Sequence, residues 1–111
     1  MKQMQKLKSD LRKFVKERNW QNYHSPKNLA MALSVECAEL LELFQWMTED
    51  ESWKLDAGII KKLKDEIGDV QIYLIMLADK FNLNPIDEAK AKLKKNKKKY
   101  PIKHNQFNKF L

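Results

Sequence analysis

Two stretches of the sequence each place a glutamate in the centre of an apolar helical stripe, and this repeated arrangement restricts the folds open to the chain. At roughly 100° per residue, the first stripe consists of Leu29, Leu33, Glu36, Leu40, Leu43 and Met47. The second consists of Ile59, Leu63, Glu66, Val70, Tyr73, Leu77 and Phe81. We predict two long helices, over about residues 26–47 and 59–81, that each carry one stripe.

Each central glutamate has a second acid three residues further along. Glu39 follows Glu36, and Asp69 follows Glu66. Residues three apart are neighbours on a helix surface, so each helix can present two carboxylates to one point. A carboxylate on a buried face must be paired, protonated or bound to a metal. If the two helices face each other, four acids converge, and hard divalent cations such as magnesium prefer oxygen clusters of this kind.

A second interpretation of these acids is open. They are surface acids if the helical register differs from the one assigned, or they pair with some of the lysines. One ExxE sequence would carry little information, but two acidic pairs centred on matching apolar stripes favour the metal site.

The composition favours one all-helical domain. The chain has 111 residues, close to the usual domain size, and contains only 2 Gly and 3 Pro. We predict an all-α fold with four main helices that form an oligomeric bundle. The predicted ranges are 4–18, 26–47, 59–81 and 86–98, in one domain over residues 1–101 with an irregular tail over 102–111.

Several helix starts are marked by capping signals. Ser25-Pro26 and Asn84-Pro85 each combine an N-cap residue with a proline at the first helical position. Thr48 and Glu51 have the spacing of a capping box, which predicts a short additional helix.

The predicted helix over residues 26–47 is apolar nearly all round its circumference. Such a helix is buried on more than one side. A domain of this size has too few other helices to cover it, so we predict a homodimer or a homotetramer.

The charge is positive and unevenly distributed. The formal net charge is +7, and seven lysines lie between Lys90 and Lys99. Such a run is typical of a nucleic-acid surface, a site for a phosphorylated small molecule or a solvated helix face. No stretch approaches ~20 apolar residues, and the N-terminus lacks the apolar run of a signal peptide. We therefore expect a cytoplasmic protein that does not bind a membrane.

The segment between the first two helices, residues 19–24, carries two aromatic residues and a histidine. Loops held by a rigid scaffold often contact ligands. Trp20 and Tyr23 fit equally a plug at the end of the bundle, and His24 fits a local hydrogen bond. The pattern alone leaves both interpretations open.

Several of these segments together resemble the MazG-like all-α nucleoside triphosphate pyrophosphohydrolases, most of all their dCTP pyrophosphatase branch. The resemblance lies in residues 17–20, His24 to Asn28 and the ExxE segment from Ser34 to Trp46. It continues in the ExxD segment over residues 65–74 and in the closing motif over 92–101. It covers about residues 10–101.

The resemblance implies hydrolysis of a nucleoside or deoxynucleoside triphosphate, such as dCTP or a modified dNTP, to the monophosphate and pyrophosphate. Magnesium would be the cofactor. The catalytic and metal-binding residues that it implies are Glu36, Glu39, Glu66 and Asp69. One of the glutamates would double as the base for the attacking water, and spacing does not identify it.

The resemblance also implies substrate-binding residues in an active site shared between subunits. Trp20, Trp46 and Tyr73 would line the base and sugar pocket, and Lys92, Asn96, Lys99 and Tyr100 would hold phosphates. His24 and Asn28, from the matching motif, complete the predicted set.

One position departs from the pattern expected of dCTP-specific relatives. Leu11 occupies the place nine residues before Trp20 where those relatives would have a histidine, so a preference for cytosine does not follow. The rival hypothesis for the whole chain is a non-enzymatic helical module that binds nucleic acid through Lys90 to Lys99. In that case the acids would serve only as salt-bridge partners between subunits.

Overall fold

The computed structural model describes residues 2–102, and the regular elements within this range are helices. The elements are α1 (Lys2–Glu17), the 3₁₀ turn η1 (Gln21–Tyr23), α2 (Pro26–Glu42), α3 (Glu49–Ser52), α4 (Ala57–Asp79) and α5 (Pro85–Lys99). No strand occurs within residues 2–102, so the predicted all-α class with four main helices is confirmed. Except for Ile102, the predicted irregular tail lies outside the described residues, and the domain limits stay a prediction.

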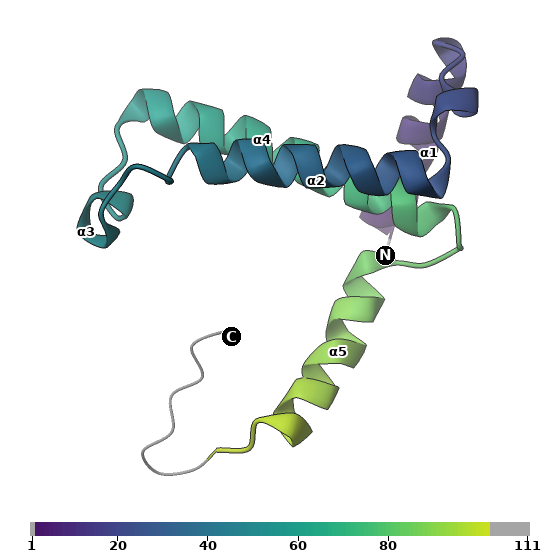
Figure 1. Ribbon diagram of the computed structural model, residues 1–111. Coiled ribbons are helices and arrows are strands. Elements are labelled where there is room, and N and C mark those ends of the chain that lie inside the picture. The colour runs from purple at the N-terminus through teal and green to yellow at the C-terminus, as the bar shows by residue number, and fades with distance from the viewer. Residues whose placement is uncertain (1, 103–111) are drawn as a thin grey trace.

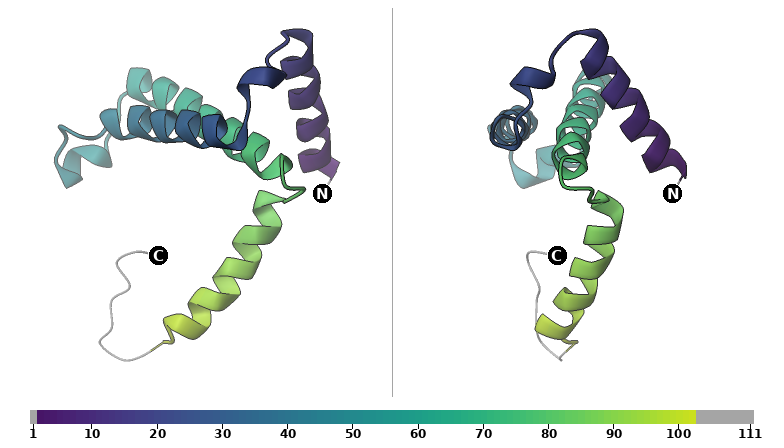
Figure 2. Two further views of the ribbon diagram at one scale, coloured as in Figure 1. Left: turned by 45° about the vertical axis from the view of Figure 1, so that its right-hand side comes forward. Right: turned by 90° about the vertical axis from the view of Figure 1, so that its right-hand side faces the viewer.

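Helix α4 is the centre of the fold. It packs against α2, α1 and α5. Figure 1 shows α2 and α4 side by side and antiparallel, with α3 at one end of the pair. At the other end α1 crosses α4, and α5 leads away from the pair (Figures 1 and 2). None of the helices within residues 2–102 combines the length and apolar character needed to cross a membrane.

The predicted N-caps are present. Ser25 Oγ accepts a hydrogen bond from the Asn28 backbone N–H at 3.1 Å, and Asn84 Oδ1 accepts one from Ile86 at 2.9 Å. Thr48 and Glu51 form the reciprocal capping box, which starts α3. These side chains satisfy backbone donors that have no partner within a helix.

The prediction that the second helix continues to about Met47 is wrong. Helix α2 ends at Glu42, and the next residues form tighter turns, in which the Phe44 N–H donates to Leu41 O at 2.9 Å. The apolar stripe continues through Leu43 and Met47, which are half-buried. The spacing of its apolar residues therefore does not show where the helix ends. The chain must turn here because Thr48 takes the extended conformation of an N-cap before α3.

Two asparagines end helices in the left-handed region of backbone space. Asn19 has a φ of 57° after α1, and Asn82 has a φ of 56° after α4. Asparagine tolerates this conformation better than most residues. The turn at Asn19 lets the Trp20 N–H donate to Val15 O at 3.0 Å, the bond pattern of a Schellman helix end. The chain therefore folds Trp20 back toward α1.

The buried core of the single chain is small. Among residues 2–102, the buried apolar residues are Met4, Val15, Leu29 and Ile75. Helix α2 turns one apolar face to α4, but Met31, Val35 and Leu41 on its remaining surface are exposed, with Leu41 at 62%. The predicted burial of α2 on more than one side is thus not met within one chain.

Candidate active site

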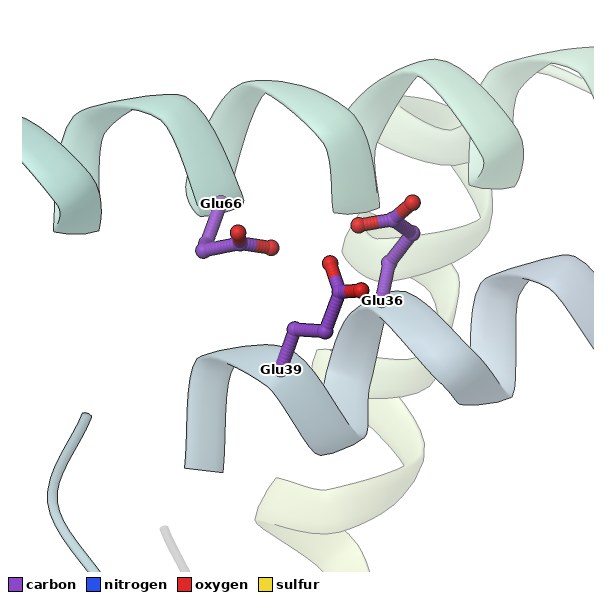
Figure 3. A group of neighbouring side chains, drawn as sticks. All are labelled: Glu36, Glu39 and Glu66. Atoms are coloured by element: carbon purple, nitrogen blue, oxygen red, sulfur yellow. The ribbon is translucent and has the colours of Figure 1, made fainter. Parts of the chain in front are cut away.

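Three carboxylates converge between α2 and α4. Glu36 and Glu39 come from α2, and Glu66 comes from α4. One carboxylate oxygen from each lies within 4.8 Å of those of the other two. Figure 3 shows the three side chains pointing toward one another in the gap between the helices. The two glutamate-bearing stripes therefore do face each other.

The surroundings of the two central glutamates are apolar. Their neighbours along the stripes are half-buried, namely Leu33 and Leu40 in α2 and Leu63 and Val70 in α4. Glu36 Oε2 and Glu66 Oε2 are buried and have no hydrogen-bond partner. Leaving a buried polar atom unpaired is costly, so these oxygens are suited to a ligand.

The clustering shifts the titration of these acids. Burial, followed by the hydrogen bond and negative charge of Glu39, raises the pKa of Glu36 to about 7. Burial and the charge of Glu39 also raise the pKa of Glu66. No lysine or arginine among residues 2–102 forms an ion pair with Glu36, Glu39 or Glu66. Within one chain, the interpretation that these acids pair with lysines therefore finds no support.

Asp69 lies near this group without joining it. Its negative charge contributes to the raised pKa of both Glu36 and Glu66, and its side chain is half-buried. The group of oxygens within 4.8 Å nevertheless consists of the three glutamates alone. A set of hard carboxylate oxygens with unpaired buried lone pairs fits a divalent cation such as magnesium.

We expect the affinity for Mg²⁺ to depend on pH below about 7. Glu36 must lose its proton to bind a cation, and its pKa is raised to about 7. The affinity should therefore rise about tenfold per pH unit, for one displaced proton, and level off above that pKa. Calorimetric titration of the protein with Mg²⁺ on both sides of pH 7 measures this. An affinity that does not change with pH would contradict a site containing Glu36.

A pocket of about 410 Å³ lies next to Asp69, between α1 and α4. Its lining residues are Asp10, Leu11, Phe14, Val15, Trp20, His24, Asp69, Ile72, Tyr73 and Met76. We call this the aromatic pocket. Among the predicted substrate-binding residues, it brings together Trp20, His24 and Tyr73. Asp69 connects it to the carboxylate cluster.

Phe14 supports Trp20 at the wall of the aromatic pocket. The two rings meet edge to face with centroids 5.6 Å apart, and the Arg18 guanidinium lies 3.6 Å from the centre of the Phe14 ring. The His24 ring lies 6.3 Å from Trp20. Phe14 is not among the substrate-binding residues predicted from the sequence, because helical spacing does not distinguish a core position from a pocket wall.

The remaining predicted substrate-binding residues lie elsewhere in the single chain. Trp46, in the turns after α2, is 89% exposed and does not line the aromatic pocket. Asn28 Nδ2 donates to Tyr23 O at 3.0 Å, which closes the loop before α2. The predicted phosphate ligands Lys92, Asn96, Lys99 and Tyr100 belong to α5 and its end, and α5 extends away from the α2–α4 pair (Figure 1).

Fold and site together define an all-α protein with a candidate divalent-metal centre beside an aromatic pocket. The sequence model of the MazG-like family matches residues 31–109. The chain belongs to this family, as its sequence motifs predicted.

Two mammalian relatives support this assignment. The chain is 37% identical to human dCTP pyrophosphatase 1 over 90 residues, which are 79% of this chain and 53% of that protein. It is 34% identical to the bovine protein of the same name over 93 residues, 80% of this chain and 54% of that one. The chain thus spans about half the length of these relatives.

A solved structure matches the fold over nearly its whole length. A crystal structure of a pyrophosphatase from Archaeoglobus fulgidus superimposes with a TM-score of 0.79 at 43% sequence identity. The match covers 90% of this chain and 94% of that one. The helical arrangement described above is therefore shared with a protein described as a pyrophosphatase.

Proposed function

We propose that this protein is a magnesium-dependent nucleoside triphosphate pyrophosphohydrolase that converts a nucleoside or deoxynucleoside triphosphate to the monophosphate and pyrophosphate. One observation carries the proposal: a cluster of three carboxylates, with two unpaired buried oxygens, lies beside an aromatic pocket. The names of the relatives, dCTP pyrophosphatase 1 and pyrophosphatase, support the same reaction.

The carboxylates of Glu36, Glu39, Glu66 and Asp69 hold the cation in this proposal. When bound, a divalent cation neutralises charge that develops on phosphate oxygens and activates water. The two helices fix the directions of the carboxylates, and the apolar stripes limit the access of bulk water. Without the cation, a proton on Glu36 relieves the repulsion within the cluster, in keeping with its pKa of about 7.

The aromatic pocket takes the nucleoside part of the substrate. Its volume of about 410 Å³ falls within the range of small-molecule pockets. Trp20 and Tyr73 offer ring faces for stacking, and His24 offers a polar edge. Leu11 makes the wall apolar at the position where dCTP-specific relatives are expected to have a histidine. We propose dCTP or a modified dNTP as the substrate, used in clearing the nucleotide pool.

The phosphate ligands come from a second subunit in this proposal. Lys92, Asn96, Lys99 and Tyr100 lie on the helix that points away from the carboxylates of its own chain. Trp46 is also free to reach a partner, because it is 89% exposed. A homodimer or homotetramer would bring these residues to the carboxylates of a neighbouring chain and cover the exposed apolar side of α2.

We therefore expect an obligate oligomer that buries more than ~2,000 Å² in total, as permanent interfaces commonly do. The physical reason is the exposed apolar surface of α2, which includes Met31, Val35 and Leu41. Light scattering on dilute protein measures the mass. A folded and active monomer would rule out both the interface and the shared active site.

The reaction itself is tested by pyrophosphate release from a panel of nucleoside and deoxynucleoside triphosphates, with modified pyrimidines included. We expect release with Mg²⁺ and none in the presence of a chelator. No release from any nucleotide, combined with salt-sensitive binding of DNA, would favour the nucleic-acid-binding module instead. The run of lysines on α5 is the feature that would then carry the binding.

A further inference from the structure

Helix α1 forms a whole wall of the aromatic pocket but is weakly anchored. It contributes Asp10, Leu11, Phe14 and Val15 to the lining. Its C-terminal end leads through the turn at Asn19 to Trp20. Only Met4 and Val15 of this helix are buried. The apolar packing of α1 is therefore slight for an element that places so much of the pocket.

Polar contacts hold α1 against the end of α4. Arg12 Nε donates to Asp79 Oδ2 at 2.7 Å, and Arg12 Nη2 donates to Asp79 Oδ1 at 2.6 Å. Lys8 Nζ donates to Leu83 O at 2.8 Å and lies 4.0 Å from Asp79 Oδ1. We call Lys8, Arg12 and Asp79 the α1–α4 clamp. The Lys8 and Asp79 side chains are 13% and 16% exposed, and the Arg12 side chain, which covers Asp79 from the solvent side, is 64% exposed.

The geometry of the clamp fixes the rotation of α1 as well as its distance from α4. A guanidinium that bonds both oxygens of one carboxylate is held in one plane. Asp79 is the last residue of α4, so the clamp joins α1 to the C-terminal end of the central helix. Arg12 directly follows Leu11 and lies two residues before Phe14. A turn of α1 about its axis would therefore move both of these pocket residues.

The clamp also adjoins the pocket through His24. A smaller cavity of about 120 Å³ has Lys8, Arg12, Asp79 and His24 in its lining. His24 also lines the aromatic pocket. Leu11, Val15 and Met76 also line both cavities, so the clamp and the proposed nucleoside site share a wall.

We propose that Arg12 and Asp79 are positioning residues that set the affinity of the aromatic pocket for the nucleoside part of the substrate. This inference rests on the proposed function, because it takes the aromatic pocket as the nucleoside site. The clamp residues are not members of the carboxylate cluster, which consists of Glu36, Glu39 and Glu66. On α4 the clamp uses Asp79, at the C-terminal end of the helix, whereas Glu66 lies in its middle. Its loss should weaken nucleoside binding while the chemistry at the cluster continues.

The test compares Asp79→Asn and Arg12→Met with Lys13→Met. The control removes a positive charge from the same helix, at a lysine that forms no ion pair within residues 2–102. For each variant we would measure kcat and KM for dCTP, the affinity for dCMP by calorimetry, and inhibition by inorganic triphosphate. Inorganic triphosphate probes the phosphate and metal sites without occupying the aromatic pocket.

Each clamp variant should raise KM and weaken dCMP binding about five- to tenfold, within the usual range for a broken pair of contacting residues. kcat should stay within about twofold, and inhibition by inorganic triphosphate should not change. The double variant should match either single variant, because both remove the same interaction. Lys13→Met should behave like the wild type.

Two outcomes would overturn the inference: clamp variants with unchanged KM and dCMP affinity, or an equal loss of affinity for dCMP and inorganic triphosphate. If these variants fail to fold, Arg12→Lys keeps the charge without the fork and should give a smaller change of the same kind. A wild-type protein that hydrolyses no nucleotide would refute the proposed function instead. In that case dCMP affinity alone would decide whether the clamp acts on the pocket.

Discussion

Replacing Glu39 by glutamine should lower kcat at least about a hundredfold. The loss of one group that stabilises charge in a transition state commonly lowers kcat by about a hundred- to a thousandfold. Glu39 is one of the three carboxylates whose oxygens lie within 4.8 Å of one another. Glutamine keeps the size of the side chain but removes the charge that a cation requires. Asp69→Asn should lower kcat by at least a similar factor. Pyrophosphate release at saturating nucleotide and Mg²⁺ measures both effects.

The same Glu39→Gln substitution should leave the metal-free fold intact or more stable. The hydrogen bond and charge of Glu39 contribute to the raised pKa of Glu36, so removing that charge lessens the repulsion. Glu42→Gln is the matched control, because Glu42 lies on the same helix outside the carboxylate cluster. Its activity should equal that of the wild type. Full activity of Glu39→Gln would refute the metal site, and unfolding of this variant would show a structural role.

Trp20→Ala should weaken nucleotide binding about five- to hundredfold, since stacking of a base on an aromatic side chain is worth roughly 1–3 kcal/mol. Trp20 lies outside the main helices and lines the aromatic pocket. Metal affinity should change little, because the carboxylates lie on other elements. Calorimetry with a non-hydrolysable nucleoside triphosphate analogue measures the affinity, and a melting curve of the same variant measures the stability.

Trp53→Ala is the control for the loss of an indole ring. Trp53 follows α3, is 86% exposed and does not line the aromatic pocket. Its removal should leave nucleotide affinity unchanged. For Trp20→Ala, unchanged nucleotide affinity with a large fall in melting temperature would identify Trp20 as a structural plug, and the nucleoside site would have to lie elsewhere.

The parts of this fold that depend on local patterns were predictable from the sequence. The apolar stripes identified the two long helices and the face on which Glu36 and Glu66 lie, because a helical period assigns faces directly. Side chains at Ser25, Thr48 and Asn84 marked helix starts through contacts within a few residues. Trp20 and Tyr73 were predicted as substrate-binding residues from the family resemblance, and both line the aromatic pocket in the structure.

The parts that depend on distant contacts were not predictable. The end of α2 at Glu42 follows from the path of the chain to α3, and no glycine or proline marks it. The role of Phe14 depends on the angle at which α1 crosses α4. The spacing of the apolar residues in α1 gives no information about this angle. The pairing of Arg12 with Asp79 joins residues far apart in the sequence, and each looks like an ordinary surface charge by itself.

The antiparallel pair of α2 and α4 also determines the order in which the two halves of the site can assemble. All three clustered carboxylates belong to this one helical hairpin, which is closed by the short connection over residues 43–56. Closing a short loop costs little chain entropy, and contacts that are local in sequence form early in folding. The aromatic pocket needs α1 from the opposite end of the sequence to dock on the far end of α4. We therefore expect the chain to bring its carboxylates together first and to complete the aromatic pocket later.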